Sequence, residues 1–141
     1  MPVLTRWYLR SALLYLAAAL LLAVVLALPV DIPAFVRAMN PAYFHLFMVG
    51  WATQMIFGVI YWMFPILTRE NPRGNERLGW TSYILLNVGL LMRVAGEPLV
   101  ATYPESGLGW MLAISAVLQW LAAVVFVFLA WPRVKDRYRG G

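Results

Sequence analysis

Four long apolar runs, separated by short polar connections, set the pattern of the chain. The runs cover residues 7–30, 41–67, 78–95 and 107–131. A helix needs ~20 apolar residues to cross a bilayer, and each run is close to that length or longer. Connections this short make consecutive helices antiparallel neighbours. The pattern therefore predicts one all-α domain over residues 1–141, an integral membrane four-helix bundle.

Prolines and a glycine mark the predicted helix ends. Asn40 and Pro41 occupy the cap and first helical positions of the second helix, where these residue types are favoured. Pro65 lies near the end of that helix, Gly96 is expected to stop the third, and Pro132 the fourth. The first run exceeds the apolar region of a secretory signal and no small-residue cleavage site follows, so we expect it to be a retained helix.

Composition agrees with a bundle built against lipid. Hydrophobic residues make up 63% of the chain and charged residues 12%, whereas soluble domains have about 25% charged residues. The chain has no cysteine. This excludes disulfides, thiolate metal sites and haem attached through Cys-x-x-Cys-His.

Lysine and arginine are unevenly distributed over the two ends of the predicted helices. One side holds Arg37 and Arg93, with Asp31, Glu97 and Glu105 in the same outer connections. The other side holds nine: Arg6, Arg10, Arg69, Arg73, Arg77, Arg133, Lys135, Arg137 and Arg139. The positive-inside rule then predicts both termini, including the basic tail 132–141, in the cytoplasm of a prokaryotic-type inner (plasma) membrane. Basic residues at helix ends indicate lipid as the partner and argue against nucleic acid.

The second run has two distinct faces when it is drawn as an α-helix with about 100° between residues. One face carries Gly50, Gln54, Gly58 and Tyr61. Small residues four apart let helix backbones approach closely, and a buried glutamine can hydrogen-bond across the interface. The opposite face carries His45, Val49, Ala52, Ile56 and Met63. One face is thus predicted to pack, and the other presents a lone imidazole.

His45 is the only histidine and lies near the outer end of its predicted helix. An ionisable residue inside a membrane is costly, so a functional role is the default hypothesis. Arg93 and Arg37 are expected at the same level, and arginine binds carboxylates well. This layout predicts a haem with its iron at His45 and its propionates at the two arginines. Two alternatives stay open: His45 only hydrogen-bonds, and Arg93 extends to the lipid headgroups.

The segment HLFMVGWATQMIFGVIYWMFP, residues 45–65, carries a family resemblance. It resembles the histidine-bearing helices of the catalytic subunit of haem-copper oxidases, especially the cytochrome cbb3 and nitric oxide reductase branch. The shared features are a histidine near the outer end, then Gly-Trp, Gly, Tyr and Pro. The stretch that follows, up to Pro98, is similar to small four-helix membrane proteins grouped as oxidase subunit I-like.

The resemblance implies an architecture. The family's catalytic subunit has twelve helices in a pseudo-threefold arrangement of four-helix units, and the second helix of each unit carries metal-binding histidines. This chain is similar to one such unit, with His45 at the position of the low-spin haem ligand. A homotrimer would restore the twelve helices. The family's copper histidines and cross-linked tyrosine have no counterpart here, so we do not expect the chain to be an oxidase by itself.

One histidine per chain limits the sites that a trimer can build. Closed threefold symmetry makes every site equivalent. The leading hypothesis is a homotrimeric haem b-binding membrane protein for electron transfer, gas binding or haem handling, with respiratory-chain proteins as candidate partners. A second hypothesis is a copper or zinc ion held on the axis by three copies of His45. A third is a cofactor-free scaffold or accessory subunit of a respiratory complex that packs through Gly50, Gln54 and Gly58.

Overall fold

The computed structural model describes residues 1–134, and this part of the chain is helical without strands. Its four long helices are α1 (Val3–Ala27), a composite helix (Asn40–Met63), α5 (Glu76–Thr102) and α6 (Gly109–Ala130). Each is long and apolar enough to cross a membrane. The chain is therefore a multi-pass membrane protein by helix length and composition. Lys135, Arg137 and Arg139, predicted for the cytoplasmic tail, lie outside the described residues.

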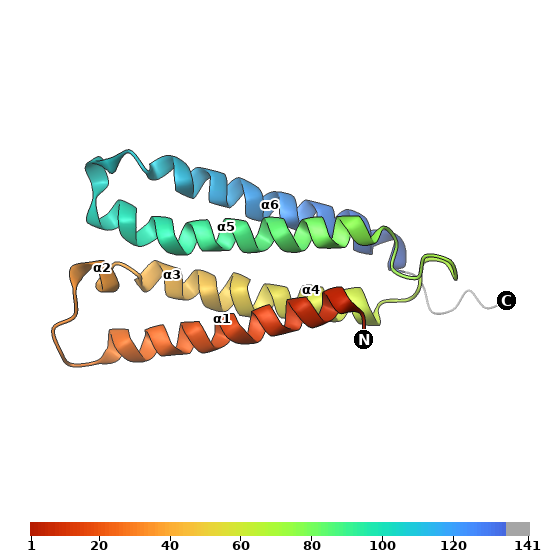
Figure 1. Ribbon diagram of the computed structural model, residues 1–141, viewed down its shortest axis with the longest axis horizontal. Coiled ribbons are helices and arrows are strands. Elements are labelled where there is room, and N and C mark those ends of the chain that lie inside the picture. The colour runs from red at the N-terminus through yellow and green to blue at the C-terminus, as the bar shows by residue number, and fades with distance from the viewer. Residues whose placement is uncertain (135–141) are drawn as a thin grey trace.

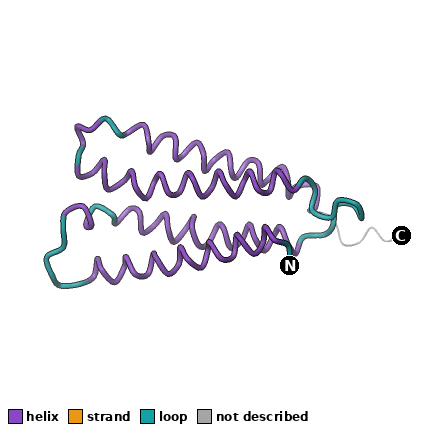
Figure 2. The backbone as a smooth tube through the Cα atoms, in the orientation of Figure 1, coloured by secondary structure: helices purple, strands orange, loops and turns teal. Residues whose placement is uncertain are grey.

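The four helices form two antiparallel hairpins. Figure 1 shows α1 beside the composite helix and α5 beside α6, and Figure 2 shows that the connections lie only at the two ends of the bundle. One end holds the N-terminus, the connection between α4 (Gln54–Met63) and α5, and the 3-10 turn Trp131–Arg133 that follows α6. We call it the terminal end. The opposite end holds the short helix α2 (Ala34–Arg37) and the 3-10 turn Pro104–Ser106; we call it the α2 end.

The composite helix is not α-helical throughout. It begins as α3 (Asn40–His45), continues as a π-helix (Leu46–Thr53) and ends as α4. Pro41 lies in the first turn, where its missing N–H costs nothing. Phe64 is extended, with ψ 151°, because Pro65 disfavours the helical conformation of the residue before it. The helix thus ends at Met63, earlier than the predicted residue 67.

The third long helix, α5, extends beyond its predicted end. The prediction that Gly96 stops the helix is wrong, since α5 continues through Pro98 to Thr102. Gly96 is buried against α6, where an added Cβ would lie 3.2 Å from Cδ2 of Leu112. The glycine therefore serves close packing rather than capping. As a consequence Glu97, predicted in an outer connection, lies on a membrane-length helix.

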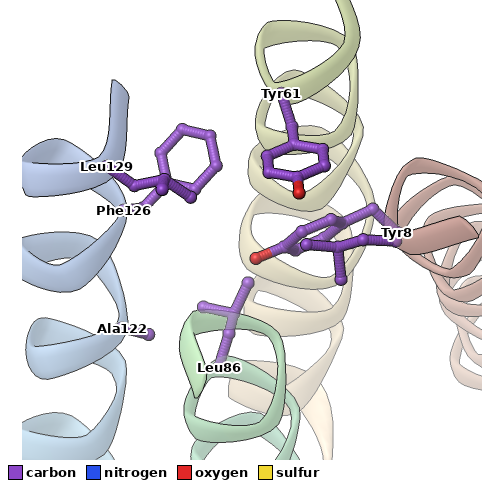
Figure 3. Close-up of a cluster of buried hydrophobic side chains, with 7 residues drawn as sticks. Tyr8, Tyr61, Leu86, Ala122, Phe126 and Leu129 are labelled. Carbon is purple, nitrogen blue, oxygen red and sulfur yellow. The ribbon is translucent and has the colours of Figure 1, made fainter. Parts of the chain in front are cut away.

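An aromatic core joins the two hairpins toward the terminal end. Figure 3 shows the side chains of Tyr8 of α1, Tyr61 of α4 and Phe126 of α6 gathered in the space between their helices. Phe57 of α4 stacks on Phe126 with ring centroids 4.0 Å apart. The buried members of this core are Leu4, Tyr8, Tyr61, Leu86, Ala122, Phe126 and Leu129. Aromatic contacts of this kind add to the dispersion energy that holds helices together in lipid. The core fixes the positions of α4 and α5, which carry the polar groups described next.

Candidate functional site

His45 is the last residue of α3, directly before the π-helix. Its Nδ1 atom lies 3.1 Å from the carbonyl oxygen of Pro41 and 3.2 Å from Oε1 of Glu97. The His45 side chain is 31% exposed and that of Glu97 is 10% exposed. The contact bridges two helices, because Glu97 belongs to α5. A π-helix begins directly after His45, and such segments occur frequently at functional sites.

The surroundings of Nδ1 favour one tautomer of His45. Both neighbours of Nδ1, a carbonyl and a carboxylate oxygen, are acceptors. A neutral imidazole has one donor and one acceptor nitrogen, so these neighbours favour the proton on Nδ1. Within the described residues Nε2 makes no hydrogen bond. In this tautomer the free lone pair of the imidazole is on Nε2.

Arg93 holds the other side of Glu97. Its Nη1 lies 3.4 Å from Oε1 of Glu97, four residues further along α5. Its Nη2 donates to the carbonyl of Leu112, and its Nε to Oγ of Ser115, both on α6. With a side chain 19% exposed, Arg93 is directed into the α5–α6 hairpin. We call His45, Glu97 and Arg93 the His45 site.

Arg37, the other arginine predicted for a cofactor, lies apart from these contacts. It is the last residue of α2, at the same end of the bundle as the His45 site. The side chain is exposed, and no hydrogen bond or ion pair joins it to another residue of the described chain. Sequence reasoning thus places all three residues at one end of the bundle, but the structure brings only His45 and Arg93 together, through Glu97.

The predicted helical wheel of the second helix needs correction. It placed His45 and Gln54 on opposite faces, yet His45 contacts Glu97 and Gln54 contacts Asn87, both on α5. The π-helix between them has wider turns than an α-helix, so 100° per residue does not hold there. A side-chain hydrogen bond spans one such turn, from Oγ1 of Thr53 to the carbonyl of Met48 at 2.9 Å.

The residues predicted for packing are buried inside the chain's own bundle. At Gly50 an added Cβ would lie 2.7 Å from Cβ of Tyr15, and at Gly58 2.9 Å from Cβ of Tyr8. Gln54 and Tyr61 are buried as well. Because α1 covers this face, it is not free to contact a second copy or another subunit. A scaffold role would have to use a different surface.

A second polar group lies in the middle of the bundle. Nε2 of Gln54 donates to Oδ1 of Asn87 at 3.0 Å, and Nδ2 of Asn87 donates back to Oε1 of Gln54 at 3.2 Å. The hydroxyl of Tyr15 donates to Oδ1 of Asn87 at 2.9 Å. Asn87 also donates to the carbonyl of Tyr83. We call Tyr15, Gln54 and Asn87 the central amide cluster; it ties α1, α4 and α5 together.

The sequence alone does not reveal the contacts of Glu97 and Arg133. The pattern predicts Glu97 in a connection, and the one signal for its role is its spacing of four from Arg93, which is the spacing of a helical ion pair. For Arg133 the sequence predicts only a contribution to membrane topology. Arg133 is 1% exposed and donates to the carbonyls of Tyr61, Phe64 and Pro65 at 2.9, 2.7 and 3.0 Å. It thereby caps the end of α4.

The described residues of one chain contain no group of three or more histidine, cysteine or carboxylate side chains that could hold a metal ion. What one chain offers is a single oriented imidazole. No protein-family model, curated protein or solved structure matches this chain.

Proposed function

We propose that this protein binds haem b in the membrane and uses Nε2 of His45 as the axial ligand. The observation that supports this most is the environment of Nδ1, which has two acceptors and no donor. Ligating histidines usually donate their other ring nitrogen to a carboxylate or a backbone carbonyl, which fixes the ring and the tautomer. His45 has both kinds of acceptor beside Nδ1.

The bound haem would supply a one-electron redox couple or, with its sixth position open, a site for a small gas. Electron transfer, gas binding and haem handling all remain within this proposal. The chain's own part is to orient His45 and to surround it with apolar helices. Of the two arginines proposed for the propionates, Arg37 has the freer side chain, because Arg93 already contacts Glu97 and α6.

We further propose a homotrimer in a prokaryotic-type inner membrane, with respiratory-chain proteins as electron partners. Each chain offers one histidine, so symmetric sites carry one His45 each. The orientation with both termini in the cytoplasm is supported by the terminal end, which gathers Arg6, Arg69, Arg73, Arg77 and Arg133. Such an excess of arginine is typical of the cytoplasmic side.

The test is the absorption spectrum of protein purified after expression with added haem. We expect a Soret band whose intensity is lost in His45→Ala. Met48→Leu is the matched control, since Met48 is exposed and lies three residues further along the same helix; it should keep the band. Absence of a Soret band in the unchanged protein, also after reconstitution with haemin, would refute the proposal.

Two further measurements separate the other hypotheses. Elemental analysis that finds copper or zinc, removed by His45→Ala, would favour the three-histidine metal trimer. A folded protein with neither iron, copper nor zinc would favour the cofactor-free scaffold. Mass measurement in mild detergent tests the trimer directly, and a monomeric haem protein would retain the ligand assignment while overturning the assembly.

A further inference from the structure

Glu97 is an unusual residue for its place in the molecule. Apart from Glu76, at the first position of α5, it is the only carboxylate in the four membrane-length helices of the described chain. Its side chain is only 10% exposed. Charged groups at such positions are expensive and are kept where they pair with another group or serve a site. The position of this carboxylate on α5 therefore needs a physical explanation.

The two oxygens of Glu97 are used unequally. Oε1 receives both contacts, from Nδ1 of His45 at 3.2 Å and from Nη1 of Arg93 at 3.4 Å. Oε2 is buried and has no hydrogen-bond partner among the described residues. An ion pair built for stability would be bidentate, with both oxygens on the guanidinium. The Glu97–Arg93 pair is a single contact at 3.4 Å, so it leaves Oε2 without a hydrogen bond.

Glu97 constrains the imidazole of His45. Without Glu97 the proton on Nδ1 would have only the carbonyl of Pro41, which lies on the helix of His45 itself. A carboxylate is the stronger acceptor and comes from a different helix, so it fixes the ring relative to the bundle. It also raises the electron density of the imidazole and thus its basicity as a ligand.

Arg93 is in turn anchored in the second hairpin. Oγ of Ser115 accepts from Nε of Arg93 and donates to the carbonyl of Gly89 at 2.6 Å. The carbonyl of Leu112 accepts from Nη2 of Arg93 at 3.2 Å. The guanidinium thus sets the position of Glu97 from α6, through contacts that do not involve His45.

We infer that Glu97 is the positioning residue of His45: it accepts the Nδ1 proton, fixes the tautomer and ring of the ligand, and tunes the iron–histidine bond, while Arg93 holds Glu97 in place. The inference rests on the proposed haem function for its effect on iron. The contact itself can be tested without haem, because the chain has only one histidine. ¹⁵N labelling of histidine therefore reports on His45 alone.

The experiment compares unchanged protein with Glu97→Gln and Glu97→Ala. Glu105→Gln is the matched control, an exposed carboxylate in the turn after α5. In the haem-free protein at mildly alkaline pH, we expect the Nδ1–H tautomer to dominate in the unchanged chain and to lose its dominance in Glu97→Ala. In the haem protein we expect the affinity for haemin to fall about 10- to 100-fold. The iron–histidine stretch in resonance Raman spectra should move to lower frequency in both Glu97 variants.

The outcomes distinguish this inference from the proposed function. A tautomer and an iron–histidine stretch that do not change in Glu97→Ala would overturn the inference and assign the orienting role to the Pro41 carbonyl. A Glu97-dependent tautomer in a protein that never binds haem would support the inference at Nδ1 and refute the haem function. Glu97→Gln, which keeps an acceptor oxygen, should fall between the other two proteins; a complete loss of helical content in it would contradict a merely positioning role.

Discussion

The central amide cluster and the His45 site are both polar groups inside an apolar bundle, but they differ in how completely their hydrogen bonds are made. In the cluster, Gln54 and Asn87 bond reciprocally and Tyr15 completes the set. In the His45 site, Oε2 of Glu97 has no partner within the described chain and Nε2 of His45 makes no hydrogen bond there. Closed polar groups hold helices together, whereas open ones are available to bind something else.

Arg133 and Arg93 repeat this contrast. Arg133 is almost entirely buried and uses its guanidinium on three backbone carbonyls at the end of α4. Arg93 divides its contacts between Glu97 and α6 at distances of 3.2 to 3.4 Å. The first arginine completes a helix end, and the second one is part of a site. Variants in each region should therefore separate loss of stability from loss of binding.

The largest loss of stability is expected for Arg133→Ala. The change leaves three carbonyl acceptors at the end of α4 without their donor and removes the contact between the end of α6 and α4. Bonds to a charged donor are each worth about 1.5–3 kcal/mol, so we expect about 3 kcal/mol after partial compensation by water. Unfolding in mixed micelles of mild detergent and dodecyl sulfate measures the effect.

Arg6→Ala is the control for Arg133, because Arg6 is an exposed arginine near the same end of the bundle. It should change the free energy of unfolding by less than about 0.5 kcal/mol. Arg133→Lys should recover only part of the loss, since an ammonium group cannot reach three separate carbonyls as the planar guanidinium does. Equal effects of Arg133→Ala and Arg6→Ala would show that Arg133 acts only as a positive charge.

A smaller loss is expected for Asn87→Leu, in the central amide cluster. The change keeps the side-chain volume but leaves the amide of Gln54 and the hydroxyl of Tyr15 without partners, at a cost of about 2 kcal/mol. The double variant Gln54→Met/Asn87→Leu should be more stable than Asn87→Leu alone, because the unpaired amide is removed. Strictly additive losses in the double variant would show that the two side chains do not cooperate.

Sequence patterning predicted the four helices, and the structure confirms them as membrane-length apolar segments. It also separated the small residues Gly50 and Gly58 from the exposed residues Ile56 and Met63. These features follow from composition and local spacing, which a single sequence contains. Proline and glycine were less informative. Gly96 lies inside α5 because close packing on α6 outweighs its helix-breaking tendency, and Pro98 is buried in the same helix.

The parts that could not be predicted depend on contacts between distant segments. The π-helix after His45 changes which residues share a face, and the spacing of apolar and polar residues in this segment does not predict its wider turns. The contact between His45 and Glu97 joins residues 52 positions apart by their numbers, and it exists only because α5 continues past Gly96. Arg133 likewise contacts Tyr61, which is 72 positions away. A single sequence shows the charge of such residues but not which distant residue each one contacts in the folded chain.

Among the three polar residues compared, Arg133, Asn87 and His45, the smallest loss of stability is expected for His45→Ala, and this variant sharpens the contrast most. The imidazole is partly exposed, and Glu97 keeps its contact with Arg93 when His45 is removed. We therefore expect the free energy of unfolding of the haem-free protein to fall by less than about 1 kcal/mol, although haem binding is lost. The same micelle titration, run beside Asn87→Leu, measures this. If His45→Ala destabilises the haem-free bundle as much as Asn87→Leu does, then the imidazole is a hydrogen-bonding group of the same kind as the central amide cluster, and the ligand assignment loses its structural basis.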